Sequence, residues 1–113
     1  MTDAREGKTP LQLFALRIDY LVPLDQIDAL LTPHFDYLER FYTQGSFLLS
    51  GRQVPRTGGF ILAVAASREE LEAIIACDPF VIHDAARYTV LEVSPTKASP
   101  TIQSALQQLG AWA

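Results

Sequence analysis

The sequence predicts an α+β domain of the ferredoxin-like type, with the element order β-α-β-β-α-β. Three observations support this fold. Four short apolar segments have the length and the residue types of strands. Two longer segments have the apolar spacing of amphipathic helices, and each lies between two of those strands. The chain has 113 residues and is 49% hydrophobic, so a single domain can bury a substantial core.

The expected strands form a four-stranded antiparallel sheet. The first strand has apolar residues on both of its faces, which is typical of a central strand that is covered on both sides. The polar residues 1–10 before it are expected to be a flexible arm, and the folded domain is expected over residues 11–95. The four strands are expected at residues 11–20, 46–51, 59–65 and 87–93.

The first helical segment covers residues 24–44 and contains a proline near its middle. Because proline disfavours helix at the residue before it, we expect a short turn followed by a new helix. Thr32 would be the N-cap of this helix and Pro33 its first residue, which places His34 second. Gly45 would end it.

The second helical segment begins at a capping box, with Ser67 as the N-cap and Glu70 three residues later. This helix is expected to extend through Cys77. Asp78 precedes a proline and could cap a further short helix over residues 79–84. Residues 96–113 form a C-terminal extension that is expected to be helical over 101–109.

The expected connectivity brings distant residues to one end of the domain. If the first strand runs up, the main first helix begins at the upper end and the second helix ends there. His34, the loop 51–59, Asp78 and His83 then gather at that end. The sequence therefore predicts that His34 and Asp78 lie close together.

A histidine beside a carboxylate is a candidate acid–base pair near neutral pH. The positive end of a helix disfavours the imidazolium form of His34, whereas the carboxylate of Asp78 favours it. Each residue also has a structural interpretation: His34 as a half-buried helix residue bonded to a carbonyl, and Asp78 as an ordinary N-cap. The two roles of Asp78 are compatible, because one carboxylate oxygen can cap while the other orients the histidine.

Further binding residues are expected around the same end of the domain. Arg52 and Arg56 flank the loop and could hold an anionic or phenolate oxygen by charge-assisted hydrogen bonds, although loop arginines are often simply solvated. Gly51 and His83 are the other candidates, and His83 could equally lie on a surface turn. Three tyrosines are expected to be packing residues and not acids: Tyr37, Tyr42 and Tyr88.

Composition argues against several other classes of protein. A net charge of −4 and a pI near 5.0 do not suit a general nucleic-acid binder, and no apolar run approaches the length of a membrane span. No phosphate or dinucleotide loop is present, so no cofactor is expected. Two histidines at this spacing do not suggest a zinc site. The single Cys77 fits a reducing cytoplasm.

Several short motifs resemble those of the YciI-related family. They are Pro33-His34, the strand end Leu48-Leu-Ser-Gly51, Thr57-Gly-Gly59, Asp78-Pro-Phe80 and Ala86-Arg-Tyr88. The resemblance covers roughly residues 11–95. It implies a ferredoxin-like fold that pairs through its sheets into a dimeric α/β barrel, with a His–Asp dyad at His34 and Asp78. A dehydrochlorinase that acts on a chlorinated hydroxyquinol is among the family's few assigned members.

Two positions differ from that resemblance. Many members have a proline after the strand-ending glycine, where this chain has Arg52, and this chain has a histidine at position 83. These differences affect the substrate more than the fold.

The sequence thus favours a small cofactor-independent enzyme of the lyase, isomerase or hydrolase type, acting on a small aromatic or oxygenated molecule. The alternative is a non-catalytic domain that binds a small metabolite or acts as an accessory domain. Because two helices can cover only one apolar face of the sheet, we also expect a homodimer in which the sheets pack face to face across an interface of obligate size.

Overall fold

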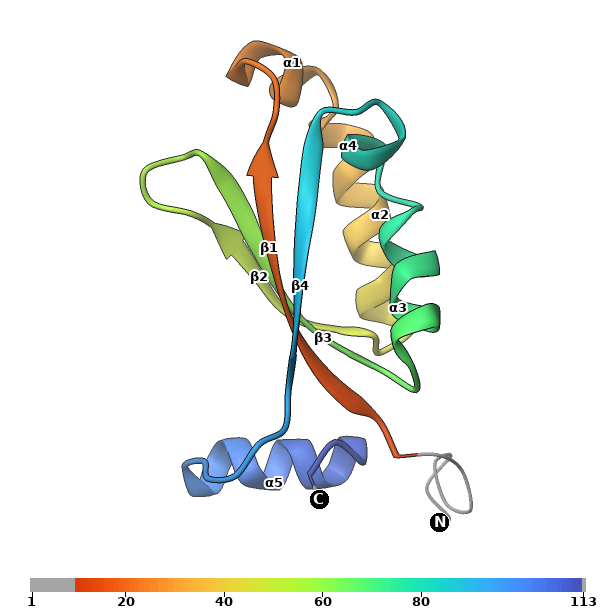
Figure 1. Ribbon diagram of the computed structural model, residues 1–113, viewed down its shortest axis with the longest axis vertical. Coiled ribbons are helices and arrows are strands. Elements are labelled where there is room, and N and C mark those ends of the chain that lie inside the picture. Colours follow the sequence, from red (N-terminus) through yellow and green to blue (C-terminus); the bar gives the residue numbers. More distant parts are fainter. Residues whose placement is uncertain (1–9, 113) are drawn as a thin grey trace.

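The computed structural model describes residues 10–112 as a four-stranded antiparallel sheet with helices packed against it (Figure 1). The expected arm, apart from Pro10, lies outside the described residues. The elements are β1 (Gln12–Tyr20), α1 (Leu24–Ala29), α2 (Leu31–Thr43), β2 (Phe47–Arg52), β3 (Gly58–Ala65), α3 (Arg68–Ile75), α4 (Pro79–Ile82), β4 (Ala86–Val93) and α5 (Pro100–Leu109).

The strand order is β2-β3-β1-β4, and every neighbouring pair is antiparallel. β1 is central, because its residue Leu16 lies opposite Ile61 of β3 and opposite Val90 of β4. The expected ferredoxin-like fold is therefore confirmed. The strand ends differ from the predicted ones by no more than one residue, which is the usual uncertainty at an element boundary.

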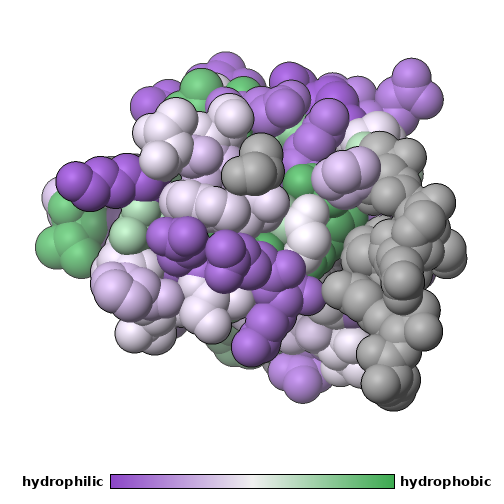
Figure 2. Space-filling model, turned by 90° about the horizontal axis from the view of Figure 1, so that it is seen from below, coloured by the Kyte–Doolittle hydropathy of each residue, from purple (hydrophilic) through white to green (hydrophobic). Residues whose placement is uncertain are grey.

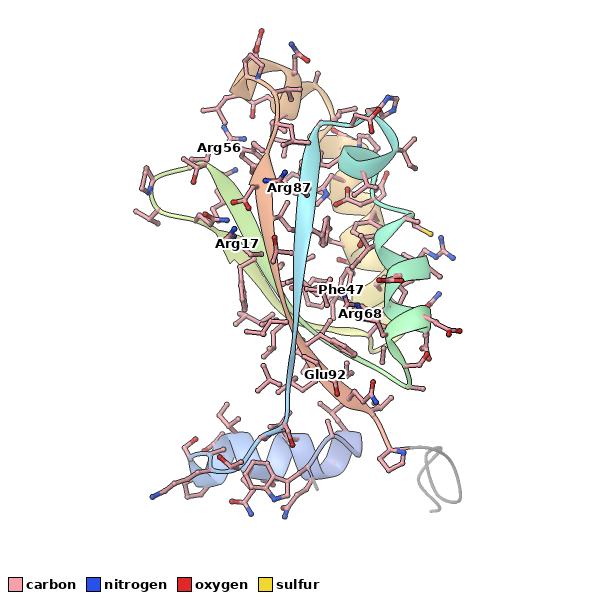
Figure 3. All side chains as sticks on the ribbon, in the orientation of Figure 1. Arg17, Phe47, Arg56, Arg68, Arg87 and Glu92 are labelled. Atoms are coloured by element: carbon pink, nitrogen blue, oxygen red, sulfur yellow. The ribbon has the colours of Figure 1, made fainter. Side chains whose placement is uncertain are left out.

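Helices α2, α3 and α4 lie on one face of the sheet and cover the main hydrophobic core (Figure 1). Alternate residues of β1, namely Phe14, Leu16 and Ile18, point into this core. Phe47 at the start of β2 lies between the sheet and the helices (Figure 3). The apolar side chains on one face of the strands thus pack against the apolar stripes of the helices.

The start of α2 differs from the prediction. Helix α1 ends at Ala29, with Leu30 as its C-cap, and α2 begins directly at Leu31, so Thr32 is not an N-cap and Pro33 is the third residue of α2. A proline is tolerated there because the first N–H groups of a helix have no intrahelical partner. His34 is consequently the fourth residue, and its backbone N–H donates to the Leu30 carbonyl at 3.0 Å.

The predicted caps of α3 and α4 are present. The Ser67 hydroxyl accepts a hydrogen bond from the Glu70 N–H, and the Asp78 carboxylate accepts one from the Phe80 N–H. Helix α3 ends at Ile75, two residues before the predicted Cys77. The short helix after Asp78 also ends early, at Ile82.

The C-terminal extension contains the expected helix, and this helix has a place in the fold that the sequence did not predict. α5 crosses the lower end of the molecule in Figure 1 and packs on the second face of the sheet. Leu106 of α5 is buried there against Leu13 and Val64. The residues of this second core are Leu11, Leu13, Val64, Leu106 and Ala111.

One part of the second sheet face is therefore covered within the chain itself. Seen from the end at which α5 lies, the surface is mostly hydrophilic or near neutral, with small hydrophobic groups (Figure 2).

Among the described residues, no helix is long and apolar enough to cross a membrane.

Candidate active site

The fold brings His34 and Asp78 into direct contact. His34 lies in the first turns of α2, and Asp78 lies immediately before α4, at the upper end of the sheet in Figure 1. The His34 Nδ1 and Asp78 Oδ1 atoms are 2.8 Å apart, which is the distance of a charge-assisted hydrogen bond. The pairing expected from the connectivity is therefore present.

Asp78 is fully buried and accepts three hydrogen bonds. Its Oδ1 atom accepts from His34 Nδ1 and, at 2.9 Å, from the Phe80 N–H. Its Oδ2 atom accepts from the Tyr88 hydroxyl at 2.5 Å. One oxygen thus both caps α4 and binds His34, whereas the sequence suggested a division of these roles between the two oxygens. Three convergent donors satisfy the carboxylate oxygens in a site without solvent contact.

His34 is nearly buried, with 8% of its surface exposed, and its ring stacks on Phe80. The ring centroids are 4.0 Å apart and the planes differ by 11°. Since an ionised carboxylate can only accept hydrogen bonds, Nδ1 must hold a proton. When the imidazole is neutral, this tautomer leaves the lone pair on Nε2, for which residues 10–112 provide no hydrogen-bond partner.

Tyr88 connects the dyad to the sheet. Its side chain faces the helices from β4, and its hydroxyl also lies 3.5 Å from the Tyr37 hydroxyl. Burial raises the pKa of Tyr88 far above the ordinary value of 10.0, and the neighbouring Tyr37 and Asp78 add to the effect. Burial likewise raises the pKa of Tyr37. Both phenols therefore remain neutral at physiological pH, and Tyr88 remains a donor to Asp78.

A cavity of about 220 Å³ opens beside His34, between the start of α2 and the upper part of the sheet. Most of its wall is apolar or aromatic, and the side chains on it that carry polar groups are those of Tyr20, His34, Ser50 and Arg52. A cavity with an apolar wall and few polar groups is the usual form of a small-molecule site. The wall is formed by Ile18, Tyr20, Leu31, His34, Phe35, Leu38, Ser50, Gly51, Arg52, Gly59, Phe60, Ile61 and Phe80.

Two of the four expected binding residues line this cavity, Gly51 and Arg52. The other two, Arg56 and His83, do not line it, and His83 has the surface position that was the alternative for it. Arg56 donates to Asp28 of α1 at 2.6 Å, and this hydrogen bond raises the pKa of Arg56. Figure 3 shows Arg56 on the loop between β2 and β3. His83 is exposed at the end of α4 and does not line the cavity.

Sequence reasoning missed three residues of the site: Tyr88, Ser50 and Phe80. A signal existed for Tyr88, because a tyrosine on the buried face of a strand needs a partner for its hydroxyl. Ser50 belongs to the motif at the end of β2, but nothing in that motif pointed to its hydroxyl, which accepts a hydrogen bond from Tyr42 at 2.6 Å. Phe80 was recognised in a motif but not as the surface on which His34 stacks.

The described residues contain no group of three or more histidine, cysteine, aspartate or glutamate side chains placed to bind a metal ion. The chemistry that these residues can perform by themselves is proton transfer at His34 Nε2. The buried carboxylate of Asp78 would stabilise the imidazolium that forms when Nε2 takes a proton.

Comparison with known proteins agrees with this architecture. The chain matches the YCII-related domain over residues 12–94, which is most of its length. The chain belongs to the YCII-related family. Helix α5 lies outside the matched residues. No curated protein sequence matches the chain.

A solved structure with the same fold is that of 5-chloro-2-hydroxyhydroquinone dehydrochlorinase (TftG) from Burkholderia phenoliruptrix AC1100, in complex with 2,5-dihydroxybenzoquinone. The TM-score is 0.62 and the sequence identity is 19%. The match covers 79% of this chain and 97% of the dehydrochlorinase. This similarity shows that the two proteins share a fold.

Proposed function

We propose that this protein is a small enzyme that catalyses proton transfer on a small organic substrate, with His34 as the base and Asp78 as the residue that orients it. The observation that supports this most strongly is the asymmetry of the imidazole. Its Nδ1 atom is bound by a fully buried carboxylate, while its Nε2 atom belongs to a residue that lines a cavity. A histidine fixed in this way has one tautomer and one reactive nitrogen.

The proposed substrate is a small planar ring that carries oxygen. An apolar cavity of about 150 Å³ in another protein holds benzene, so about 220 Å³ is enough space for a substituted ring. Phe35, Phe60 and Phe80 offer aromatic surfaces on the wall, and Arg52 offers a positive charge. The dehydrochlorinase of the same fold, whose structure holds 2,5-dihydroxybenzoquinone, supports this choice.

The reaction type that fits these groups is an elimination or isomerisation that begins with removal of a proton. His34 Nε2 would accept the proton from the substrate, and the Asp78 carboxylate would stabilise the resulting imidazolium. A later step would return the proton to the product or to a leaving group. This scheme needs no cofactor, because the protein supplies both the base and the charge that balances it.

The test requires variants that remove the base without disturbing the fold. His34→Ala is a poor choice, because it would leave the buried Asp78 charge without one of its donors and would remove the stack on Phe80. His34→Asn is better, because the amide nitrogen can take the place of Nδ1 and donate to Asp78 while Nε2 is lost. Asp78→Asn keeps the shape but removes the charge.

The assay is a screen of hydroxylated and halogenated benzene derivatives, including 2,5-dihydroxybenzoquinone as a ligand, first for thermal stabilisation and then for turnover. We expect the wild-type protein to bind and convert a compound that His34→Asn binds but does not convert. Equal turnover by His34→Asn would exclude the histidine as the base. Binding without turnover by the wild type across the panel would favour a non-catalytic metabolite-binding domain instead.

We further propose that the protein forms a homodimer through the second face of its sheet. Beyond the part covered by α5, this face exposes Leu49 and Leu91, whose exposed fractions are 56% and 63%. Arg87 and Arg17, which is paired with Asp19, lie on the same face (Figure 3). Sedimentation of a monomer at micromolar concentration would contradict this proposal.

The proposed compartment is the cytoplasm. Cys77 is a free thiol that forms no disulfide within the described residues, which suits a reducing environment. Fractionation of cells that express the native gene, followed by detection of the protein, tests this: recovery from an oxidising compartment would refute it.

A further inference from the structure

The upper part of β2 presents two polar side chains to the cavity, and neither is used by the His34–Asp78 pair. Ser50 lies opposite Ile61 and Arg52 lies opposite Gly59 in the pairing of β2 with β3. Because alternate residues of a strand share a face, Ser50 and Arg52 both point to the side on which Ile61 enters the core beneath the helices. Both line the cavity together with His34.

The hydroxyl of Ser50 is oriented by a residue outside the cavity wall. Tyr42 of α2 donates to Ser50 Oγ at 2.6 Å, a short hydrogen bond between two hydroxyl groups. With its oxygen accepting from Tyr42, Ser50 has its own proton left to donate, and residues 10–112 provide no acceptor for it. A hydroxyl that accepts one strong hydrogen bond also becomes a stronger donor in the next.

Arg52 provides the charge at the same place. Of the arginines that form ion pairs within residues 10–112, Arg17 is bound to Asp19, Arg56 to Asp28 and Arg68 to Glu72. Arg52 has no carboxylate within ion-pair distance in that part of the chain. A hydroxyl donor and a guanidinium side by side on one strand form a set of donors that suits an oxygen with negative charge.

We propose that Ser50 and Arg52 form an oxyanion subsite that binds a phenolate or enolate oxygen of the substrate, with Tyr42 as the residue that positions Ser50. The inference rests on the proposed proton transfer and specifies its substrate class. When Nε2 of His34 takes a proton from the substrate, the electron pair of the broken bond moves through the conjugated ring to an oxygen. Donors already in place at that oxygen stabilise the charge as it develops.

A glycine on β3, beside Arg52, leaves room in the cavity for such a ligand. Gly59, opposite Arg52, has no side chain, and a Cβ atom there would lie 3.1 Å from the Gly51 carbonyl oxygen and 3.7 Å from Ile18 Cδ1. A larger residue at this position would therefore occupy cavity space between β1 and β2. Gly59 thus keeps the wall beside Arg52 open to a planar ring.

The experiment compares a ring with a negative oxygen to its neutral counterpart. The probes are 4-nitrophenol, at a pH at which it is ionised, and 4-nitroanisole, with affinities measured by calorimetric titration in 150 mM salt. We expect the wild-type protein to bind the phenolate about tenfold more tightly than the anisole, since charge-assisted hydrogen bonds are the stronger ones. This preference is the property that the subsite should confer.

Four variants separate the subsite from the rest of the pocket. Ser50→Ala and Arg52→Gln should each weaken phenolate binding by about tenfold and leave anisole binding within about twofold. Tyr42→Phe should cause a smaller loss, again for the phenolate alone, because it frees the serine hydroxyl to rotate. Arg87→Gln changes the charge equally but lies on the opposite sheet face, and it should leave both affinities unchanged.

Each other outcome overturns the subsite. Equal losses for both probes in Ser50→Ala and Arg52→Gln would show that these residues only shape the cavity. Equal binding of both probes by the wild type would refute the subsite while leaving the proposed pocket and base intact. Binding of neither probe would refute the subsite and the proposed ring-binding cavity together. Circular dichroism of each variant establishes that it is folded.

Discussion

Removing the carboxylate of Asp78 should destabilise the fold far more than the loss of an ordinary helix cap. In Asp78→Ala the cap on the Phe80 N–H disappears, which costs about 1 kcal/mol. Two further donors, His34 Nδ1 and the Tyr88 hydroxyl, lose their acceptor at a position that is buried from solvent. An unsatisfied buried donor costs about 1–3 kcal/mol. The expected total is therefore about 3 kcal/mol or more, against the 5–15 kcal/mol that is typical of a whole domain.

Asp78→Asn should cost much less, about 1–2 kcal/mol. The amide oxygen can still accept from His34 and from the Phe80 N–H, and the Tyr88 hydroxyl can rotate to accept from the amide nitrogen. What is lost is the charge assistance of two hydrogen bonds. The alanine variant loses the cap and also removes the acceptor of His34 Nδ1 and of the Tyr88 hydroxyl. The larger value follows from the two extra donors that the structure adds.

The measurement is urea unfolding at pH 7, followed by circular dichroism, for the wild type and the two variants. Asp36→Ala is the control, because Asp36 is an exposed carboxylate on α2 and its loss should change stability by no more than about 0.5 kcal/mol. An Asp78→Ala variant within about 1 kcal/mol of the wild type would refute the argument from three convergent donors. Equal losses in both variants would show that charge, and not shape, dominates.

Three further predictions concern other parts of the fold. Gly58→Ala should cost about 2–3 kcal/mol in urea unfolding, because its Cβ would lie 1.7 Å from the Ile18 carbonyl oxygen, whereas Gly51→Ala meets no atom within 4 Å and should be close to neutral. Leu106→Ala should cost about 2–3 kcal/mol and Ile102→Ala little, since the first side chain is 6% exposed and the second 53%; equal effects would contradict the packing of α5. Stability should fall as pH rises above about 10, because unfolded Tyr88 releases its proton there while burial keeps the folded phenol protonated. Below that pH this contribution is fully present. Tyr88→Phe should reduce the slope above pH 10 by up to about 1.4 kcal/mol per pH unit, and an unchanged slope in alkaline urea titrations would contradict the raised pKa.

The sequence was sufficient wherever a few neighbouring residues decide the structure. Ser67 and Glu70 define the start of α3, and Asp78 before Pro79 defines the start of α4, because a cap depends on groups within one turn. The alternating and helical apolar patterns gave the order of elements. From that order, the connectivity of the fold was enough to predict that His34 and Asp78 meet.

Local rules failed where the packing of the whole chain decides. The Thr32-Pro33 pair predicts a helix start, yet α2 begins at Leu31. The helix tolerates Pro33 in its first turn, because the N–H that a proline lacks has no intrahelical partner there. No pattern in the sequence placed Arg56 on Asp28 or turned His83 outward, because each depends on how a loop folds over a neighbouring element.

The class of fold and the pairing of a histidine with an aspartate could both be predicted from the amino-acid sequence. Tertiary structure alone decided that Tyr88 is the third donor to Asp78, that Tyr42 holds Ser50 beside Arg52, and that α5 covers part of the second sheet face. The physical reason is distance along the chain. Hydrogen bonds between a helix and a strand depend on strand register and on the position of the helix above the sheet, and no short stretch of residues specifies either.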